Sequence, residues 1–200
     1  MAMTITAELV KTLRQTTGAG ILECRNALQE TGGDLEKAAA LLRERGIAAA
    51  EERAGRETRN GMLELYSHGG GRVGVMVEVN CETDFVARTT EFRSFAHEIA
   101  LQIAGAEPLY LNVDDVPREV VAEQQEKVRK QALDEGKPAA IVDKMVEGGL
   151  SKYYDEVCLL RQAYVRDESK TVDELLKEVI AATGENITIR RFVRWAAGEA

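Results

Sequence analysis

The chain has 200 residues, of which 44% are hydrophobic and 30% charged, and its formal net charge is −8. This length suits one or two domains with a real hydrophobic core, and no run of residues approaches the roughly eighteen consecutive apolar residues of a membrane span. A net negative chain is also poorly suited to nucleic acid, because that affinity rests largely on Lys and Arg contacts to phosphate. We therefore expect neither a membrane nor a nucleic acid as a direct partner.

The first 46 residues predict three short helices that form a small bundle. Thr6 is placed to cap the first helix, and residues 18–20 interrupt the pattern after it. The second helix is predicted over residues 21–30. Asp34 is placed to cap the third, and Gly46 is a suitable residue to end it.

Leu22 does not fit the apolar stripe of the second helix. It shares a face with Arg25, Asn26 and Gln29, so we expect its side chain to be exposed. Single exposed leucines are common on protein surfaces. The alternative is a small hydrophobic contact surface that Leu22 forms together with Ile21.

Residues 47–60 are rich in alanine and charge and predict a helical or extended linker. A β-hairpin is predicted over residues 61–80, with its turn at 68–71. The alternate valines from Val73 to Val79 predict a half-buried strand. The next helix begins near Thr89 and carries a core-facing stripe composed of Phe92, Phe95, Ala96, Ile99 and Ile103.

The remainder of the chain predicts further helices and one last strand. The expected segments are a polar helix between 117 and 136, shorter helical segments around 141–146 and 150–158, a helix capped at Thr171, and a strand over 187–195 that carries Arg190, Arg191 and Arg194 on a solvated face. This order predicts an α+β fold, in which a core domain of residues 61–200 has a small antiparallel sheet of about three strands packed against helices.

The segment from Asn80 to Val86 directly follows the valine strand and leads into the next helix. A large aromatic residue, Phe85, is thereby placed in a tight connection, and loops on a rigid scaffold often carry function. Two interpretations remain open. Phe85 either inserts into a partner, or it packs under the strand–helix corner while Asp84 caps the turn.

The sequence gives little support for an enzyme. Residues 69–74 match G-x-G-x-x-G, but here the glycines join two strands, whereas a dinucleotide site needs them to open a helix. Cys81 beside Glu82 has no adjacent base, so we favour a buried structural cysteine over a thiol nucleophile.

The cysteine and histidine content limits the chemistry further. The cysteines Cys24, Cys81 and Cys158 are odd in number and widely spaced, which is typical of free thiols in a reducing cytoplasm. Together with His68 and His97 they show no metal-ligand spacing, so we expect neither a metal nor a cofactor.

Two long stretches, Leu13–Leu28 and Val77–Arg88, closely resemble the two signature stretches of the bacterial translation elongation factor Ts family, and the similarity covers essentially the whole chain. The resemblance implies a ubiquitin-associated-type bundle over residues 1–46 and a guanine-nucleotide exchange factor for elongation factor Tu. In this family a Thr-Asp-Phe-Val element, here Thr83, Asp84, Phe85 and Val86, presses on the GTPase domain and displaces its Mg²⁺.

The resemblance also implies which residues contact the partner, namely Val10, Leu13, Arg14, Gly20, Ile21, Leu22, Asn80, Cys81 and Glu82. Many family members carry two core modules, whereas this chain has one, so the resemblance implies a homodimer. The main alternative is a non-catalytic interaction protein whose N-terminal bundle binds a helical or ubiquitin-like partner. A hydrolase built on Cys81 is the third interpretation.

Overall fold

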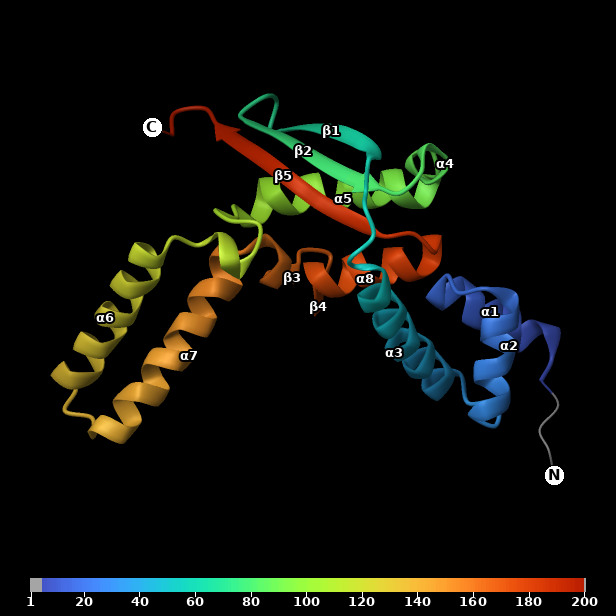
Figure 1. Cartoon of the computed structure of the whole chain (residues 1–200), viewed down its shortest axis with the longest axis horizontal. Helices are drawn as coiled ribbons and strands as arrows, with labels where there is room; N and C mark the ends of the chain where they lie inside the picture. Colours follow the sequence, from blue (N-terminus) through green and yellow to red (C-terminus); the bar gives the residue numbers. More distant parts are fainter. Residues whose placement is uncertain (1–4, 200) are drawn as a thin grey trace. The chain divides into compact units, whose positions relative to one another are not determined.

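The computed structural model describes residues 5–199, which form an α+β structure as predicted (Figure 1). The helices are α1 (Ala7–Thr17), α2 (Ile21–Glu30), α3 (Leu35–Arg53), α4 (Asp84–Ala87), α5 (Thr90–Ala106), α6 (Arg118–Asp134), α7 (Ala139–Val157) and α8 (Val172–Thr183). The strands are β1 (Asn60–His68), β2 (Val73–Cys81), β3 (Ala163–Tyr164), β4 (Asp167–Thr171) and β5 (Ile187–Ala196), and two short 3₁₀-helices are η1 (Val113–Asp115) and η2 (Leu159–Arg161).

The main sheet has the strand order β1-β2-β5, and β3 and β4 form a separate antiparallel pair. β1 and β2 form the predicted hairpin. The Ala197 N–H after β5 donates to the Arg72 carbonyl before β2 at 2.8 Å, so β5 runs antiparallel to β2. Within residues 5–199, no helix combines the length and the apolar composition that a bilayer crossing requires.

Contacts divide the described chain into two compact units. The first contains residues 5–62, 79–96 and 174–190, and the second contains residues 63–78, 97–173 and 191–199. The predicted division into a bundle of residues 1–46, a linker of 47–60 and a core domain of 61–200 stays a prediction.

The N-terminal helices of the first unit begin where their capping residues predict. The Thr6 hydroxyl accepts a hydrogen bond from the Leu9 N–H at 3.3 Å, and the Asp34 carboxylate accepts one from the Lys37 N–H at 3.0 Å. These bonds satisfy N–H groups that have no partner inside the helix. The helices enclose a small core composed of Leu13, Cys24, Ala27, Leu28 and Ala38.

The prediction that Gly46 ends the third helix is wrong, because α3 continues to Arg53. A Cβ atom on Gly46 would lie 3.0 Å from the Cβ of Ala181 in α8. Glycine therefore serves here for close approach between two helices of the first unit. It costs helix propensity but does not break the helix.

Burial follows the predicted alternation in β2 and the predicted stripe in α5. Val75, Val77 and Val79 are buried, whereas Met76 is exposed. The five apolar residues expected to face the core from α5 are all buried, namely Phe92, Phe95, Ala96, Ile99 and Ile103. Both patterns are confirmed.

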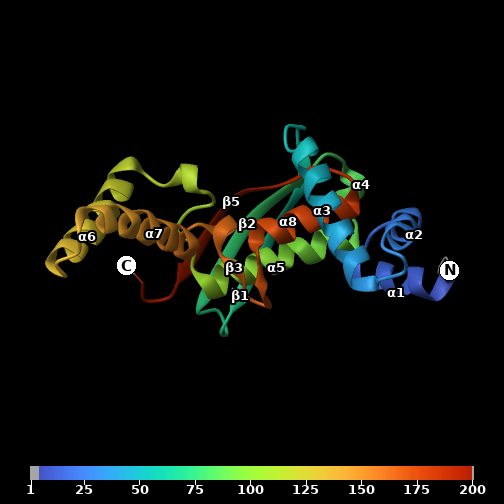
Figure 2. The ribbon, with the colours of Figure 1, turned by 90° about the horizontal axis from the view of Figure 1, so that it is seen from below.

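In the second unit, α6 and α7 lie side by side as a helical hairpin (Figures 1 and 2). Its small core contains Ala132, Val142 and Val146. The two short segments predicted over 141–158 are one continuous helix, α7, which corrects that expectation. A Cβ atom on Gly149 would lie 2.7 Å from a methyl carbon of Val128, so glycine at this position permits the close packing of the hairpin.

Gly61 in β1 gives a test of this architecture, since its φ of +152° is rarely adopted by other residues and a Cβ there would lie 2.2 Å from the Val79 carbonyl oxygen. We expect Gly61→Ala to lower the free energy of unfolding by about 2 kcal/mol or more and the Tm by roughly 4–8 °C. The matched control is Gly74→Ala, because Gly74 has an ordinary φ and no atom within 4 Å of the added methyl. Thermal unfolding that lowers the Tm of both variants equally would contradict the prediction.

Candidate protein-binding site

The segment after β2 forms a tight turn that ends in the short helix α4. Phe85 in this turn is 79% exposed, so the interpretation of a ring packed beneath the strand–helix corner is wrong. Thr83 caps α4, since its hydroxyl accepts from the Val86 N–H at 3.4 Å. One of the two open interpretations made Asp84 the cap of the turn, but its carboxylate instead forms an ion pair with Arg88 at 2.8 Å.

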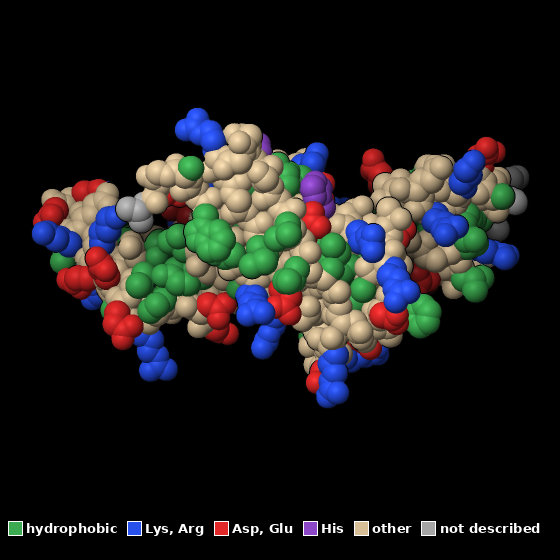
Figure 3. Space-filling view, turned by 90° about the horizontal axis from the view of Figure 1, so that it is seen from above, with side chains coloured by type: hydrophobic (Ala, Val, Ile, Leu, Met, Phe, Trp, Pro, Cys, Tyr) green, Lys and Arg blue, Asp and Glu red, His purple; other side chains and the backbone are tan. Residues whose placement is uncertain are grey.

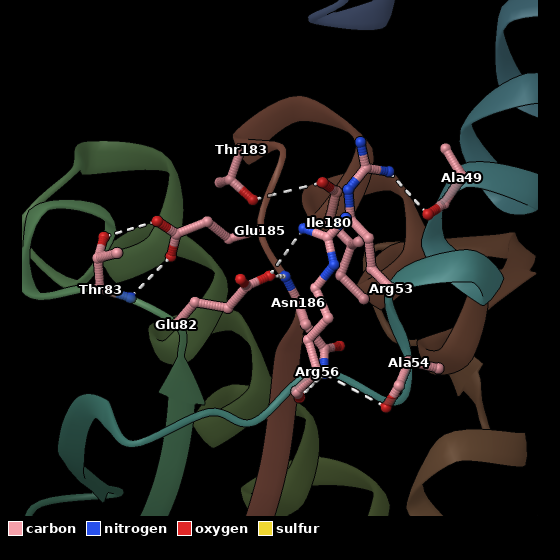
Figure 4. Close-up of polar contacts among 10 residues, drawn as sticks. All are labelled: Ala49, Arg53, Ala54, Arg56, Glu82, Thr83, Ile180, Thr183, Glu185 and Asn186. Carbon is pink, nitrogen blue, oxygen red and sulfur yellow. Dashed lines mark hydrogen bonds and ion pairs between the residues drawn. The ribbon is translucent and has the colours of Figure 1, made fainter.

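Two contacts join Thr83 to a segment far away in the sequence. The Glu185 carboxylate accepts from the Thr83 N–H at 3.0 Å and from the Thr83 hydroxyl at 2.6 Å (Figure 4). Hydrogen bonds to an ionised acceptor are among the stronger ones in proteins. The first residue of the turn is therefore tied to the loop between α8 and β5.

Glu82 and Asn186 extend this polar junction toward the end of α3. Glu82 accepts from the Asn186 N–H at 2.6 Å and lies 3.5 Å from the guanidinium of Arg56 (Figure 4). The Asn186 side chain donates to the carbonyls of Arg56, at 2.7 Å, and Ala54, at 3.4 Å. Asn60 donates to the Glu82 carbonyl at 2.7 Å, which fixes the chain just before the turn.

Sequence reasoning missed Glu185 and Asn186 as parts of the site. Residues 184–186 have the composition of a turn before a strand, and nothing local indicates that their side chains face Thr83 and Glu82. The pairs are separated by more than a hundred residues in the chain.

Cys81 is buried, and its Sγ donates to the Thr83 carbonyl at 3.1 Å. Burial, reinforced by the nearby charge of Glu185, raises the pKa of the Cys81 thiol to about 11. A thiol with such a pKa is almost fully protonated near neutral pH and is a poor nucleophile. The interpretation of a structural cysteine is therefore favoured over a hydrolase built on Cys81.

A second surface lies on the N-terminal bundle. Val10 and Arg14 of α1 and Ile21 of α2 help to line an open groove with a volume of about 500 Å³. Leu22 is 71% exposed, which confirms the expectation that it does not belong to the core. Gly20 is the N-cap of α2, and its N–H donates to the Glu23 carboxylate at 2.9 Å.

Leu13 and Cys81 differ from the other residues for which the resemblance implies a partner contact. Leu13 is 1% exposed and lies inside the core of the bundle, and Cys81 is fully buried. Neither side chain is accessible to another molecule in this structure. We assign both to the packing that supports the two surfaces, not to the surfaces themselves.

The histidines and carboxylates of residues 5–199 form no cluster of three or more potential metal ligands. His97 bonds through Nδ1 to Glu64 at 2.8 Å and lies edge-on to Tyr66. The accessible features of the described chain include an exposed aromatic turn at Phe85 and, on the bundle, an open groove and the exposed Leu22. Such features suit contact with another macromolecule.

Comparison with known proteins shows which family the chain resembles. The family model described as elongation factor TS matches residues 29–199. Elongation factor Ts of Coprothermobacter proteolyticus is 59% identical over 197 residues, which cover 98% of this chain and 100% of that protein. Elongation factor Ts of Caldanaerobacter subterraneus subsp. tengcongensis is 58% identical, with 98% of each chain covered, and that of Carboxydothermus hydrogenoformans is 56% identical, with 98% and 90% covered.

Leu22 and Leu28 on α2 form a matched pair for testing the bundle surface, since the first is exposed and the second fully buried. We expect Leu28→Ala to lower the free energy of unfolding by about 2–5 kcal/mol, the usual cost of such a cavity. Leu22→Ala should change it by less than about 0.5 kcal/mol. Chemical denaturation measures both. A large destabilisation by Leu22→Ala would show that Leu22 contributes to the core.

Proposed function

Because this chain belongs to the elongation factor Ts family, we propose that it is a guanine-nucleotide exchange factor for elongation factor Tu in translation elongation. It binds the GDP form of that GTPase and promotes GDP release. The observation that carries the proposal is Phe85, an aromatic side chain 79% exposed at the tip of an anchored turn. The described chain matches its relatives over nearly their full length, so both surfaces lie within the matched region.

In the proposed mechanism, Thr83–Val86 acts as a wedge. Asp84 and Phe85 press against the GTPase domain, displace the partner's Mg²⁺ and disturb its phosphate site. Mg²⁺ bridges phosphate and protein oxygens, so its displacement removes a large local charge that holds the nucleotide. This chain performs no covalent chemistry in the reaction and needs no cofactor or metal of its own.

The free energy for exchange comes from differential binding. The factor must bind the nucleotide-free partner more tightly than the GDP-bound partner, and by linkage GDP then weakens the factor's binding equally. Burial of one Phe contributes roughly 1.5–3 kcal/mol, or one to two orders of magnitude in an equilibrium constant. A shift of about 10⁴ requires roughly 5.5 kcal/mol, so the wedge needs further contacts.

We propose that the bundle supplies part of the remainder. Val10, Arg14 and Ile21 help to line its groove, and Leu22 presents an apolar side chain that the fold does not require. These residues dock on the GTPase domain, while Gly20 brings the loop before α2 close to it. The core domain of residues 61–200 contacts a more distant part of elongation factor Tu. The complex forms in the cytoplasm.

We further propose that the protein is a homodimer, formed through the outer face of the sheet in the second unit. Leu63, Leu65, Met76 and Trp195 are exposed there, Trp195 by 70%, and Figure 3 shows hydrophobic side chains gathered over the sheet. Side chains alternate between the two faces of a strand, so Leu63 and Leu65 lie on the face away from Glu64. Glu64 bonds to His97 of α5 on the inner face. An apolar face of this kind is typical of a protein–protein interface.

One expectation about the arginines of β5 is wrong. Arg194 was expected on a solvated face, but only 13% of its side chain is exposed, and it forms ion pairs with Glu107 and Glu199. Arg191 is solvated and pairs with Glu78 at 2.7 Å. Since Arg194 points inward, its neighbour Trp195 points to the outer face.

The proposed function is tested by release of fluorescent GDP from purified elongation factor Tu. We expect Phe85→Ala to lower the maximal rate at least about tenfold, because the lost burial corresponds to one or two decades. The fold should persist, since the ring is exposed. A circular dichroism spectrum and a Tm close to those of the wild type serve as the control.

Two outcomes would contradict the proposal. The first is a wild-type chain that does not accelerate GDP release, which would favour a scaffold that binds a partner through its bundle. The second is a Phe85→Ala variant that accelerates GDP release as fast as the wild type. The bundle is examined in the same assay with Leu22→Ala, which should raise the half-saturating concentration and leave the maximal rate largely unchanged.

The dimer is tested by sedimentation of the wild type and of Leu65→Arg. We expect the wild type to sediment as a dimer at micromolar concentration and Leu65→Arg as a monomer, because a charge buried without a partner is strongly unfavourable. The matched control is Leu133→Arg, at an exposed leucine of α6, and it should remain a dimer. A monomeric wild type at this concentration would refute the proposal.

A further inference from the structure

Hydrophobic packing holds the wedge only weakly, since Val86 and Ala87 are half-buried and the other residues of α4 are exposed. α4 is only four residues long and contains no buried residue, and the Phe85 ring is mostly in solvent. A helix of this length has no intrinsic stability in water. The orientation of Phe85 must therefore come from polar contacts.

Most polar contacts of this turn are local. The Thr83 hydroxyl accepts from the Val86 N–H, and Asp84 forms an ion pair with Arg88. The described structure shows two polar contacts between residues 83–88 and a segment outside residues 81–93. Both come from Glu185. Local bonds shape the turn, and the Glu185 carboxylate ties it to the rest of the first unit.

Glu185 is itself held firmly by its neighbours. The Gly184 N–H donates to the Ile180 carbonyl at 2.9 Å at the end of α8, and Gly184 turns the chain with a φ of +75°. Asn186, on the other side, is buried and bonded to Glu82 and Arg56 through its main-chain and side-chain nitrogens (Figure 4). The carboxylate is therefore presented by a backbone whose position is fixed on both sides, as a positioning group requires.

We propose that Glu185 is a positioning residue for nucleotide exchange, because its two hydrogen bonds to Thr83 keep the wedge turn in the conformation that presents Phe85. This inference rests on the proposed function. The Thr83 hydroxyl donates to Glu185 and accepts from the Val86 N–H, so a continuous chain of bonds spans the residue that carries the ring.

The expected kinetic signature follows from where Glu185 acts. When the bond is lost, the turn adopts the presenting conformation for only a fraction of the time. Docking through the bundle is unaffected, so the complex still forms at the same concentration. Insertion of the wedge after docking becomes slower. The maximal rate of GDP release therefore decreases, whereas the half-saturating concentration does not change.

Glu185→Gln is the most informative variant. Glutamine has the same size but carries no charge. Its amide can turn so that the oxygen accepts from the Thr83 N–H and the NH₂ group donates to the Thr83 hydroxyl, so two charge-assisted hydrogen bonds become weaker neutral ones. Thr83→Val removes the hydroxyl, and Thr83→Ser keeps it. Glu147→Gln makes the same charge change at an exposed residue of α7 and is the matched control.

In stopped-flow release of fluorescent GDP, we expect Glu185→Gln and Thr83→Val each to lower the maximal rate roughly tenfold. The half-saturating concentration should stay within about twofold of wild type. The double variant should lose less than the product of the two, since both changes break one contact. Glu147→Gln should behave as wild type, whereas Thr83→Ser, which keeps the hydroxyl, should lose less of the maximal rate than Thr83→Val.

A second measurement does not depend on activity. Amide hydrogen exchange at Thr83 and Val86 should accelerate in Glu185→Gln, whereas the amides of α8 should exchange as in the wild type. A merely structural role would instead lower the Tm and accelerate exchange throughout the first unit.

The inference is overturned if Glu185→Gln reaches the wild-type maximal rate, if its loss appears only together with global unfolding, or if the Thr83 amide keeps its protection. If the wild-type chain itself does not accelerate GDP release, the proposed function fails, and Glu185 then has no exchange to position. The two failures are distinguishable because the wild type stays active when only the inference about Glu185 fails.

Discussion

The first compact unit depends on one buried amide. Asn186 is 2% exposed, and its main-chain and side-chain nitrogens donate to Glu82 and to the carbonyls of Ala54 and Arg56. A buried polar group is tolerated only when its hydrogen bonds are made, so these three segments can meet only in one way. The end of α3, the start of the wedge turn and the start of β5 therefore share a single junction.

This junction explains how the exposed side chain of Phe85 can have a defined orientation. The ring of Phe85 gains nothing from folding, because it stays exposed, and the turn that carries it has no core of its own. Its orientation comes from the polar contacts beneath it. Stability and function are thereby separated: buried residues hold the unit together, and exposed apolar residues remain available for a partner.

The distribution of these features over the chain matters for exchange. The bundle, the wedge turn and the loop with Glu185 all belong to the first unit, which is assembled from residues 5–62, 79–96 and 174–190. In the proposed mechanism, binding energy gained by the bundle can therefore act on the wedge through packed and hydrogen-bonded groups of the same unit. The exposed apolar face with Leu65 and Trp195 belongs to the second unit and is free for a different role.

Local patterns in the sequence predicted much of the fold correctly. The two-residue alternation of β2, the stripe of α5 and the caps at Thr6 and Asp34 depend on residues near one another in the chain, and the structure shows each of them. The exposure of Leu22 could be predicted for the same reason, because the face of a helix follows from its period. Family resemblance, which rests on two long local motifs, pointed to the segment for which we propose the wedge role.

The errors have a common physical cause. Gly46 lies inside α3 because α3 approaches Ala181 closely, and that contact joins distant parts of the chain. One of the two open interpretations made Asp84 the cap of α4, whereas the structure shows Thr83 there. Both are short polar residues, and only the folded structure shows which oxygen reaches the Val86 N–H.

The sequence by itself determined where an aromatic residue interrupts the strand–helix connection and which residues around it are apolar, because these are properties of neighbouring positions. Only the tertiary structure decided that the Phe85 ring faces solvent and that Glu185 holds the turn beneath it. A hydrogen bond between residues separated by about a hundred positions leaves no periodic trace in the sequence, since it depends on how the whole unit packs.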